Sequence, residues 1–150
     1  MKNSKEAQLE WFGGNKDAVN MFNMFIELDH TWDDLVDKDN DVSEDHINNA
    51  FLIALVYLQA NPFYKSIEAD IRPMWMSVIL AYDTANRFEK NKDAHGLEIA
   101  HGLRYAAGHI IAYAVQVCVG TEKAKEYLPE IWKNIMYERF DGYREEHLNE

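Results

Sequence analysis

Helix-breaking residues are scarce in this chain, and their scarcity constrains the fold more than any other feature. Only 7 glycines and 3 prolines occur in 150 residues. Runs that alternate strictly between polar and apolar residues, which indicate strands, are also rare. Apolar residues recur instead at helical spacing. The sequence therefore predicts an all-α fold, a single-domain bundle of about five main helices.

The length and composition fit one folded domain. A chain of 150 residues normally buries a substantial core, and an apolar fraction of 47% argues against a disordered linker. Cys118 is the only cysteine, which excludes an internal disulfide and a cysteine-based zinc site. It lies in an apolar run, so we expect a small buried side chain and not a nucleophile.

Charge and hydropathy bear on location and partners. The first residues lack the apolar core of a signal peptide, and no apolar run reaches the ~18–20 residues that span a bilayer. We therefore expect a cytoplasmic protein with no membrane partner. A net charge of −11 argues against direct binding of nucleic acid, which requires clustered Lys and Arg. It favours cations, cation-bridged phosphate ligands or a basic protein partner, and it leaves a homo-oligomer open.

End signals place the helices in the first half of the chain. The first long helix is expected at residues 16–37. Ser43 is a candidate N-cap for a second, strongly apolar helix that runs to about residue 60. Pro62 can open the next helix, because proline suits a first helical position. Pro73 is expected to break or kink that helix.

The second half is expected to contain a long helix and a final helical region. The long helix covers residues 94–119, with Gly120 as its C-terminal stop. Thr121 is expected to cap the final region, which reaches about residue 143 and is interrupted near Pro129.

Carboxylates are concentrated in residues 27–45, where nine of them occur with one lysine, Lys38. Water and salt can offset their repulsion on a bare surface, whereas a groove needs divalent cations or a basic partner. On a helix that advances ~100° per residue, five polar side chains share an arc of about 120°. They are Glu27, His30, Asp33, Asp34 and Asp37. This pattern describes either a solvated acidic face or a ligand site.

Two observations favour the ligand site. Val19 and Ile26 project into the acidic arc, so we expect that side of the helix to be partly covered. In addition, no Lys or Arg occurs between Asp17 and Asp37, whereas a solvated helix face normally mixes both charges at i,i+4 spacing.

The spacing Asp33-Asp34-x-x-Asp37 resembles the first aspartate-rich motif of the isoprenyl diphosphate synthase and terpene cyclase superfamily. The resemblance implies that Asp33 and Asp37 bind Mg²⁺, which holds a substrate diphosphate, and that Asp34 is an additional ligand. Mg²⁺ suits such a site because it prefers a few carboxylates together with phosphate oxygens and waters, and Mn²⁺ is the alternative metal.

The metal hypothesis includes residues outside that motif. Asp83, Asn86 and Glu89 are the nearest counterpart of the superfamily's second metal motif, although they are spaced by three residues and the family's ligands by four. Glu89 is also a candidate catalytic residue, as is Arg104. Glu27 is a further candidate metal ligand, and His30 is a candidate base beside the metal. Metal-activated water would attack phosphorus, since no convincing protein nucleophile is visible.

Arg104 is the only Lys or Arg between Lys92 and Lys123, and it lies among apolar residues. Burying an unpaired guanidinium is costly, so Arg104 is expected to have a partner. The alternatives are an ion pair with Asp34 or Glu89, or a phosphate ligand whose charge Arg104 neutralises.

A broader resemblance covers residues 30–39, Asn61-Pro62-Phe63-Tyr64 and the region of Leu103 and Arg104. These segments are similar to a group of small tailed-phage proteins of unassigned function. The resemblance implies a viral protein that acts in the bacterial host cytoplasm, and it implies no activity.

Three functions follow as alternatives. The first is a Mg²⁺-dependent protein that acts on a small molecule bearing phosphate or diphosphate, such as a nucleotide. The second is a non-enzymatic acidic protein that binds a basic host protein, as a host-enzyme inhibitor or nucleic-acid mimic. The third is a ferritin-like di-metal protein built on Glu27-x-x-His30 and Glu98-x-x-His101. Its lone ligands would come from Glu68, Glu89 or Glu138.

Overall fold

Helices account for the secondary structure of the described part of the chain, residues 5–38 and 40–149. This computed structural model has no strand in those residues, so the predicted all-α class is confirmed. The elements in chain order are α1 (Lys5–Trp11), α2 (Lys16–Asp37), α3 (Glu44–Leu52), the π-helix η1 (Ile53–Tyr57), α4 (Leu58–Ala60), α5 (Pro62–Asn91), α6 (Ala94–Leu103), α7 (Gly108–Val119), α8 (Thr121–Ile135) and α9 (Phe140–Asn149). None of these helices is both long and apolar enough to cross a membrane.

Contacts between residues divide the chain into two compact units. The N-terminal unit extends to Ala69, and the C-terminal unit begins at Asp70. The boundary falls inside α5, so this helix contributes its first turns to one unit and the rest to the other. Each unit is described by itself below. The prediction of a single domain stays a prediction.

The first long helix lies where the sequence predicts it, at residues 16–37. Asn15 caps its start, because the Asn15 side chain accepts a hydrogen bond from the Ala18 N–H at 3.0 Å. Lys38 ends it in a left-handed conformation and donates its N–H to the Asp34 carbonyl at 3.0 Å. Both signals are local in sequence, which explains why the bounds of α2 are predictable.

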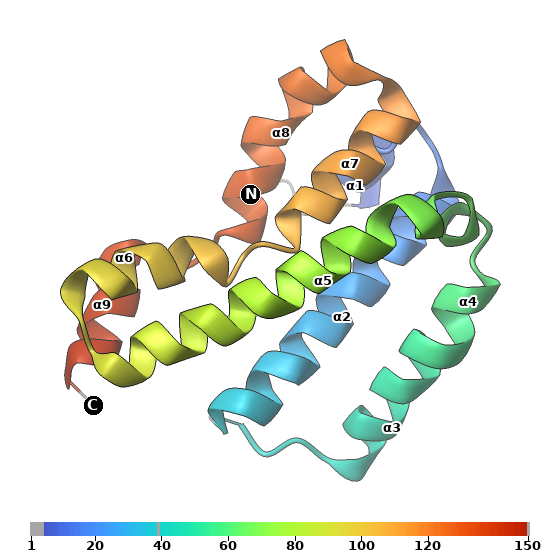
Figure 1. Cartoon of the computed structure of the whole chain (residues 1–150). Helices are drawn as coiled ribbons and strands as arrows, with labels where there is room; N and C mark the ends of the chain where they lie inside the picture. The colour runs from blue at the N-terminus through green and yellow to red at the C-terminus, as the bar shows by residue number, and fades with distance from the viewer. Residues whose placement is uncertain (1–4, 39, 150) are drawn as a thin grey trace. The chain divides into compact units, whose positions relative to one another are not determined.

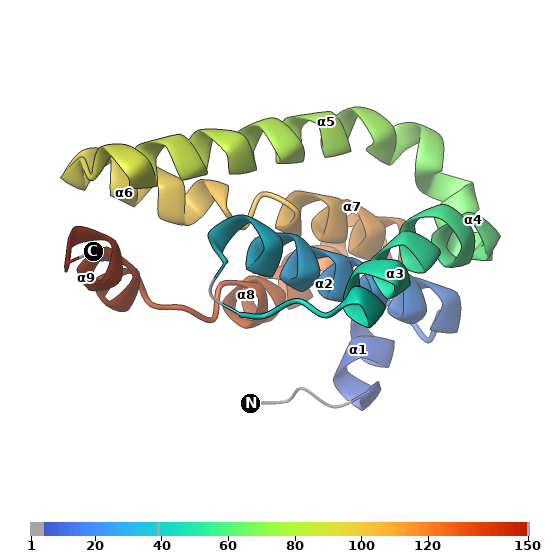
Figure 2. The ribbon, with the colours of Figure 1, turned by 90° about the horizontal axis from the view of Figure 1, so that it is seen from below.

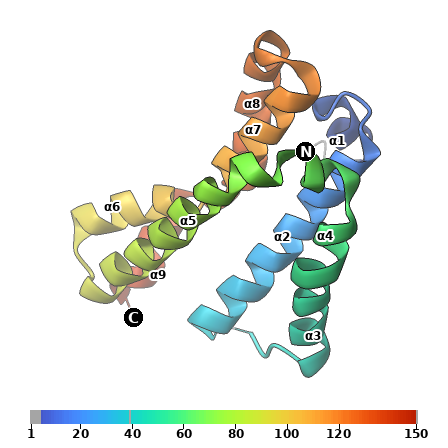
Figure 3. The same cartoon turned by 45° about the vertical axis from the view of Figure 1, so that its right-hand side comes forward.

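The second predicted helix, residues 44–60, lies beside α2 (Figures 1 and 3). Ser43 caps its start as predicted, accepting a hydrogen bond from the His46 N–H at 3.3 Å. Its middle is not α-helical, because Ile53–Tyr57 form a π-helical turn. A π-turn contains one more residue than an α-turn, which rotates the following side chains by about 100°.

The N-terminal unit has an aromatic core to which α1 contributes, although the sequence analysis did not predict this helix. Trp11 and Phe12 are buried, and their rings lie 6.4 Å and 5.7 Å from the ring of Phe22 on α2. Phe25 packs edge-on against Tyr64 of α5, with ring centroids 6.3 Å apart. These contacts join α1, α2 and the start of α5.

The proline at a helix start has its predicted effect, whereas the two helix breaks predicted at internal prolines do not occur. Pro62 is the first residue of α5, as expected. The predicted break at Pro73 is wrong, because α5 continues through it to Asn91. The predicted interruption near Pro129 is also wrong, because this residue lies inside α8. An internal proline removes only one i→i−4 hydrogen bond, and the flanking turns can hold the helix together.

The predicted long helix at residues 94–119 is wrong at its centre. Residues 104–107 form turns between α6 and α7, and Arg104 lies in them. At Gly108, the first residue of α7, the packing leaves no room for a side chain. A Cβ there would lie 2.5 Å from ring atoms of Trp132, so the α8 ring occupies the space of any side chain.

The last two helices also differ from the prediction. α7 stops at Gly120, with φ 81°, as predicted, and α7 and α8 lie side by side (Figure 3). Gly120, and not Thr121, occupies the N-cap position of α8. The interruption before α9 falls at residues 136–139.

The C-terminal unit contains a small core where α6 and α9 lie side by side near the end of α5 (Figure 2). Its buried members are Ala85, Leu97, Ala100 and Tyr143. Phe88, Leu103 and Phe140 pack against them. Tyr143, a member of this core, also contacts an ionisable residue of the same unit, Glu89.

Candidate functional site

The aspartate-rich residues lie on one helix of the N-terminal unit. Asp33, Asp34 and Asp37 are partly buried on α2, and Glu27 and His30 are exposed. We call Glu27, Asp33, Asp34 and Asp37 the acidic face. Asp39, another of the nine carboxylates, lies outside the described residues.

The carboxylates of Asp34 and Glu27 accept hydrogen bonds from neighbouring segments of the chain. Asp34 Oδ1 accepts a hydrogen bond from Asn40 Nδ2 at 2.7 Å, which ties the following loop to the end of α2. Glu27 Oε1 accepts a hydrogen bond from Asn49 Nδ2, which links α2 to α3. These carboxylates therefore contribute to local structure as well as to charge.

The flank of the acidic face is only partly covered. Val19 is buried, as the sequence analysis expects of an apolar residue on that side. Ile26, in contrast, is exposed. This side of α2 is therefore buried near its beginning, as expected, and is exposed to solvent near its middle.

The remaining candidates of the metal hypothesis lie in the C-terminal unit. Arg104 Nη1 and Glu89 Oε1 form an ion pair at 2.7 Å, and their side chains are only 12% and 8% exposed. Of the alternatives for Arg104, the ion pair with Glu89 is present in the structure. The roles proposed for these two residues in catalysis stay predictions.

Glu89 is the centre of a buried hydrogen-bond network. Tyr143 Oη donates to Glu89 Oε1 at 2.6 Å, and His147 Nε2 lies 3.9 Å from the same oxygen. Burial, and then the hydrogen bond to the carboxylate, raise the pKa of Tyr143. The Arg104 guanidinium lies 5.7 Å from the ring centroid of Tyr82, within cation–π range. The network joins α5, the turn after α6 and α9.

Asn86 has an unusual environment. Its Oδ1 atom is buried and has no hydrogen-bond partner among the described residues. A buried carbonyl oxygen without a hydrogen-bond partner destabilises the folded protein by about 1–3 kcal/mol. The role of Asn86 as a metal ligand stays a prediction.

The metal hypothesis predicts that ligating side chains lie close together. Within residues 5–38 and 40–149, no group of three or more His, Cys, Asp or Glu side chains is placed to hold a metal ion. The structure therefore adds no support to Mg²⁺ or Mn²⁺ binding by the acidic face. The metal hypothesis stays a prediction.

The Glu-x-x-His pairs have different surroundings in the two units. Glu27 and His30 are exposed on α2. His101 packs its ring 5.1 Å from that of Tyr143, and its Nε2 lies 3.0 Å from the Glu138 carbonyl. Glu98 lies 3.6 Å from His95 in an exposed pair. The di-metal hypothesis likewise stays a prediction.

Cys118 is partly buried, and burial raises the pKa of its thiol to about 11. A thiol with such a pKa is almost entirely protonated at neutral pH, and the thiolate is the nucleophilic form. The expected buried position is met only in part, and the absence of a nucleophilic role stays a prediction.

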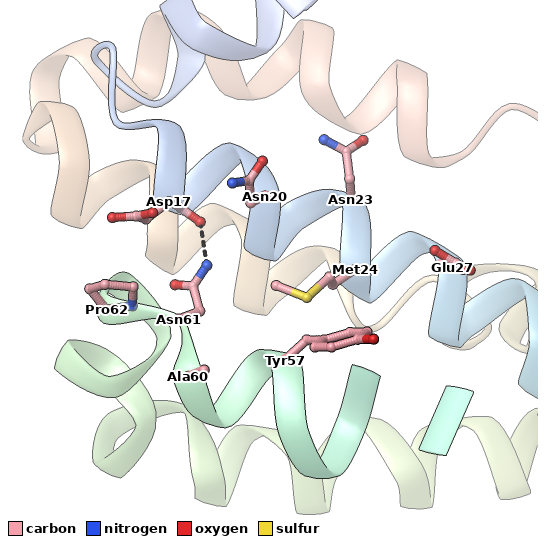
Figure 4. Close-up of a pocket in the computed structure, with 9 residues that line it drawn as sticks. All are labelled: Asp17, Asn20, Asn23, Met24, Glu27, Tyr57, Ala60, Asn61 and Pro62. Atoms are coloured by element: carbon pink, nitrogen blue, oxygen red, sulfur yellow. Dashed lines mark hydrogen bonds between the residues drawn. The ribbon is translucent and has the colours of Figure 1, made fainter. Parts of the chain in front are cut away.

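A groove of about 560 Å³ lies on the N-terminal unit, and the sequence analysis did not identify it. A stripe of α2 forms one side, and the end of η1, α4 and the start of α5 form the other (Figure 4). The lining residues are Asp17, Asn20, Asn23, Met24, Glu27, Tyr57, Ala60, Asn61 and Pro62. Only Glu27 was among the sequence candidates.

Asn61 fixes one end of this groove. It is buried, and its Nδ2 donates to the Asp17 carbonyl at 2.9 Å. Its Oδ1 accepts a hydrogen bond from the Tyr64 N–H at 2.9 Å. One side chain thus holds the start of α5 against the start of α2.

The groove has charged ends, and its middle combines apolar residues with Asn20 and Asn23. Figure 4 places Asp17 and Glu27 at opposite ends, with Met24 and Tyr57 between them. Asp17 and Glu27 are ten residues apart on α2, which corresponds to about 15 Å along the helix axis. The arrangement suits a long ligand with positive charge at both ends.

Comparison with protein-family models, curated proteins and solved structures found no match to this chain. The resemblances to the aspartate-rich motif and to small phage proteins stay predictions. The candidate sites therefore rest on the residues and their geometry alone.

Proposed function

We propose that this protein is an acidic, non-enzymatic interaction protein whose N-terminal unit binds a positively charged partner protein. The uneven distribution of charge carries the proposal. Residues 1–69 contain 13 carboxylates and 5 Lys or Arg, whereas residues 70–150 contain 13 carboxylates and 10 Lys or Arg. The negative charge is thus concentrated in one unit, where it attracts basic surfaces and accelerates association.

The acidic face is well placed for such a partner. Its carboxylates are exposed or partly buried on one side of α2, and α2 has no Lys or Arg after Lys16. A basic surface is attracted to these carboxylates, and by neutralising several of them it also relieves their mutual repulsion. Both effects favour binding.

An exposed apolar face on the neighbouring segment favours a protein over a small ion as the partner. Its members are Phe51, Leu52, Leu55, Val56 and Tyr57 of α3 and η1. Phe51 and Leu55 are more than 60% exposed. Contiguous exposed apolar residues rimmed by polar ones are typical of interaction surfaces.

The alternative, a site for phosphate-bearing small molecules, has less support. A phosphate near the acidic face would need bridging cations, and Glu89 already neutralises the guanidinium of Arg104. A positively charged partner needs no metal. If the resemblance to phage proteins holds, we expect the partner to be a basic, nucleic-acid-binding enzyme of the bacterial host.

A pull-down from bacterial lysate at increasing salt concentration tests the proposal. We expect a discrete basic protein to be retained at low salt and released as salt screens the charges. The variant carries Asp33→Asn, Asp37→Asn and Asp41→Asn and should lose that protein. The matched control neutralises three exposed carboxylates of α8 and should retain it. Its changes are Glu122→Gln, Glu126→Gln and Glu130→Gln.

Two outcomes would contradict the proposal. One is equal loss of the retained protein in the variant and the control, since only net charge would then matter. The other is a thermal stabilisation by millimolar Mg²⁺ or Mn²⁺ that Asp33→Asn with Asp37→Asn abolishes. That result would favour the metal hypothesis.

A further inference from the structure

We propose that the groove between α2 and the η1–α4 segment binds an extended stretch of the partner that carries two Lys or Arg side chains about four residues apart. This inference rests on the proposed function and adds the chemical form of the partner and the residues that recognise it.

The charges of the groove specify two cations. Asp17 and Glu27 lie at its two ends, and no Lys or Arg is among the described residues that line it. Their separation along α2 is about 15 Å. An extended chain advances about 3.3 Å per residue, so basic residues four positions apart place their charges about 13 Å apart. The two spacings agree to within the reach of a flexible Lys side chain.

The middle of the groove suits the aliphatic parts of such a segment. Met24 and Tyr57 contribute apolar surface between the two carboxylates, and Ala60 and Pro62 also line the groove. Lys and Arg bury their methylene groups along apolar surface while their charged ends stay near carboxylates or water. The exposed ring of Tyr57 also offers a face for a cation–π contact.

The local structure holds these groups in position before any ligand binds. Asn61 fastens the Asp17 end through its hydrogen bond to the Asp17 carbonyl. Asn49 fastens the Glu27 end through its hydrogen bond to the Glu27 carboxylate. Tyr57 ends the π-helical turn, a distortion that is frequent at functional sites because it redirects side chains.

The groove is continuous with the surfaces assigned to the partner above. Glu27 belongs both to the groove and to the acidic face, and Tyr57 belongs both to the groove and to the exposed apolar face. A partner that covers either face therefore extends into the groove. This continuity is the reason that we assign the groove to a segment of the partner protein.

A defined peptide probe tests the inference on the full chain. The probe is an end-capped heptapeptide of glycine and leucine with lysine at positions 2 and 6. Its isomer, with the two lysines adjacent, has the same composition and charge. Titration calorimetry at low salt should show binding of the spaced peptide at least about fivefold tighter than that of the isomer.

Three substitutions in the groove should weaken binding of the spaced peptide. Asp17→Asn and Glu27→Gln each remove one charge and are expected to cost about two- to fivefold in affinity, as exposed ion pairs do. Glu27→Gln keeps the oxygen that Asn49 contacts, so the fold is preserved. Tyr57→Leu should cost about two- to fivefold through the lost ring. Asp45→Asn, outside the groove, is the control and should change affinity less than twofold.

The outcomes separate this inference from the proposed function. If the Asp17→Asn and Glu27→Gln variants bind the spaced peptide as wild type does, the groove assignment is wrong. The lysate experiment can still succeed in that case, because its variant leaves both residues unchanged. If the linear polyamine spermine binds more tightly than the peptide and is weakened by the same substitutions, the ligand is a free polyamine and the partner-segment assignment is overturned.

Discussion

At the scale of single residues, the clearest feature is the buried ion pair of Glu89 and Arg104. Both side chains are almost fully buried, and Tyr143 gives Glu89 a second donor. Removing one member of such a pair leaves an uncompensated buried charge, which costs more than the pair itself contributes.

Arg104→Leu is expected to lower the free energy of unfolding by about 3–5 kcal/mol, because Glu89 then remains charged in the core. Adding Glu89→Leu should recover part of this loss. Arg87→Leu is the control, since Arg87 pairs with Asp83 on the surface and should cost less than about 1 kcal/mol. Urea denaturation measures all of these variants. Equal losses for Arg104→Leu and Arg87→Leu would contradict the structural role of the pair.

Two buried phenols predict how stability depends on alkaline pH. Burial raises the pKa of Tyr105 from 10.0 to about 12, and it also raises the pKa of Tyr143. As the pH rises above 10, the unfolded chain loses these protons before the folded chain does. Below pH 10 these two tyrosines should therefore contribute no pH dependence to the free energy of unfolding. The free energy of unfolding should fall between pH 10 and about 12.

Urea denaturation across that pH range, with tyrosinate absorbance to follow ionisation, tests this expectation. Tyr105→Phe and Tyr143→Phe should each flatten the decline. At neutral pH, Tyr143→Phe should also cost about 1.5–3 kcal/mol, because it removes a hydrogen bond to the buried carboxylate of Glu89. A decline of unchanged slope in both variants would mean that other groups cause it.

At the scale of elements, signals adjacent in sequence were predictable and those that depend on distant packing were not. The bounds of α2 follow from Asn15 and Lys38, which flank it. The break between α6 and α7 had no such local signal, because residues 104–107 contain neither Gly nor Pro. The close packing of Gly108 against Trp132 likewise depends on a later helix. The prolines at 73 and 129 were overestimated as helix breakers, since neighbouring turns and packing compensate for one lost hydrogen bond.

A matched pair of glycine substitutions tests the packing at this break. Gly108→Ala should lower the free energy of unfolding by about 1–3 kcal/mol, because its Cβ would overlap the Trp132 ring. Gly102→Ala, in α6, meets no atom within 4 Å and should raise it by about 0.4–1 kcal/mol. Thermal or urea denaturation gives both values. A stabilising Gly108→Ala would show that the ring moves away easily.

The candidate sites were also predictable only where their residues give a local signal in the sequence. The need of Arg104 for an acidic partner follows from its apolar neighbours, but the choice of Glu89 over Asp34 depends on the tertiary fold. The groove had one available signal, the stripe of Asp17, Asn20 and Glu27 on one side of α2. Its other side could not be anticipated, because it depends on the π-helical turn that ends at Tyr57.

At the scale of the whole molecule, the charge is distributed unevenly between the two units. Residues 1–69 contain eight more carboxylates than Lys and Arg, whereas residues 70–150 contain three more. Nine carboxylates lie within residues 27–45. Self-repulsion of this kind destabilises a folded chain when no partner or counter-ion offsets it. The same field attracts a basic partner.

Added salt should therefore raise the melting temperature of the isolated protein between about 10 mM and 150 mM ionic strength, because it screens the repulsion. The variant with Asp33→Asn, Asp37→Asn and Asp41→Asn should respond less to salt. Differential scanning calorimetry in a monovalent salt measures both. A melting temperature that falls with salt would mean that attractive ion pairs outweigh the repulsion.

The most direct measurement of the central claim is an amide NMR titration of the full chain with a short oligolysine peptide at low salt. The account predicts that perturbed amides concentrate in α2, in α3 and around the groove, from Lys16 to Pro62, and that they return to their free positions as salt is added. Perturbations confined to the C-terminal unit would contradict the claim. So would amides of Asp33 and Asp37 that respond to Mg²⁺ but not to the peptide.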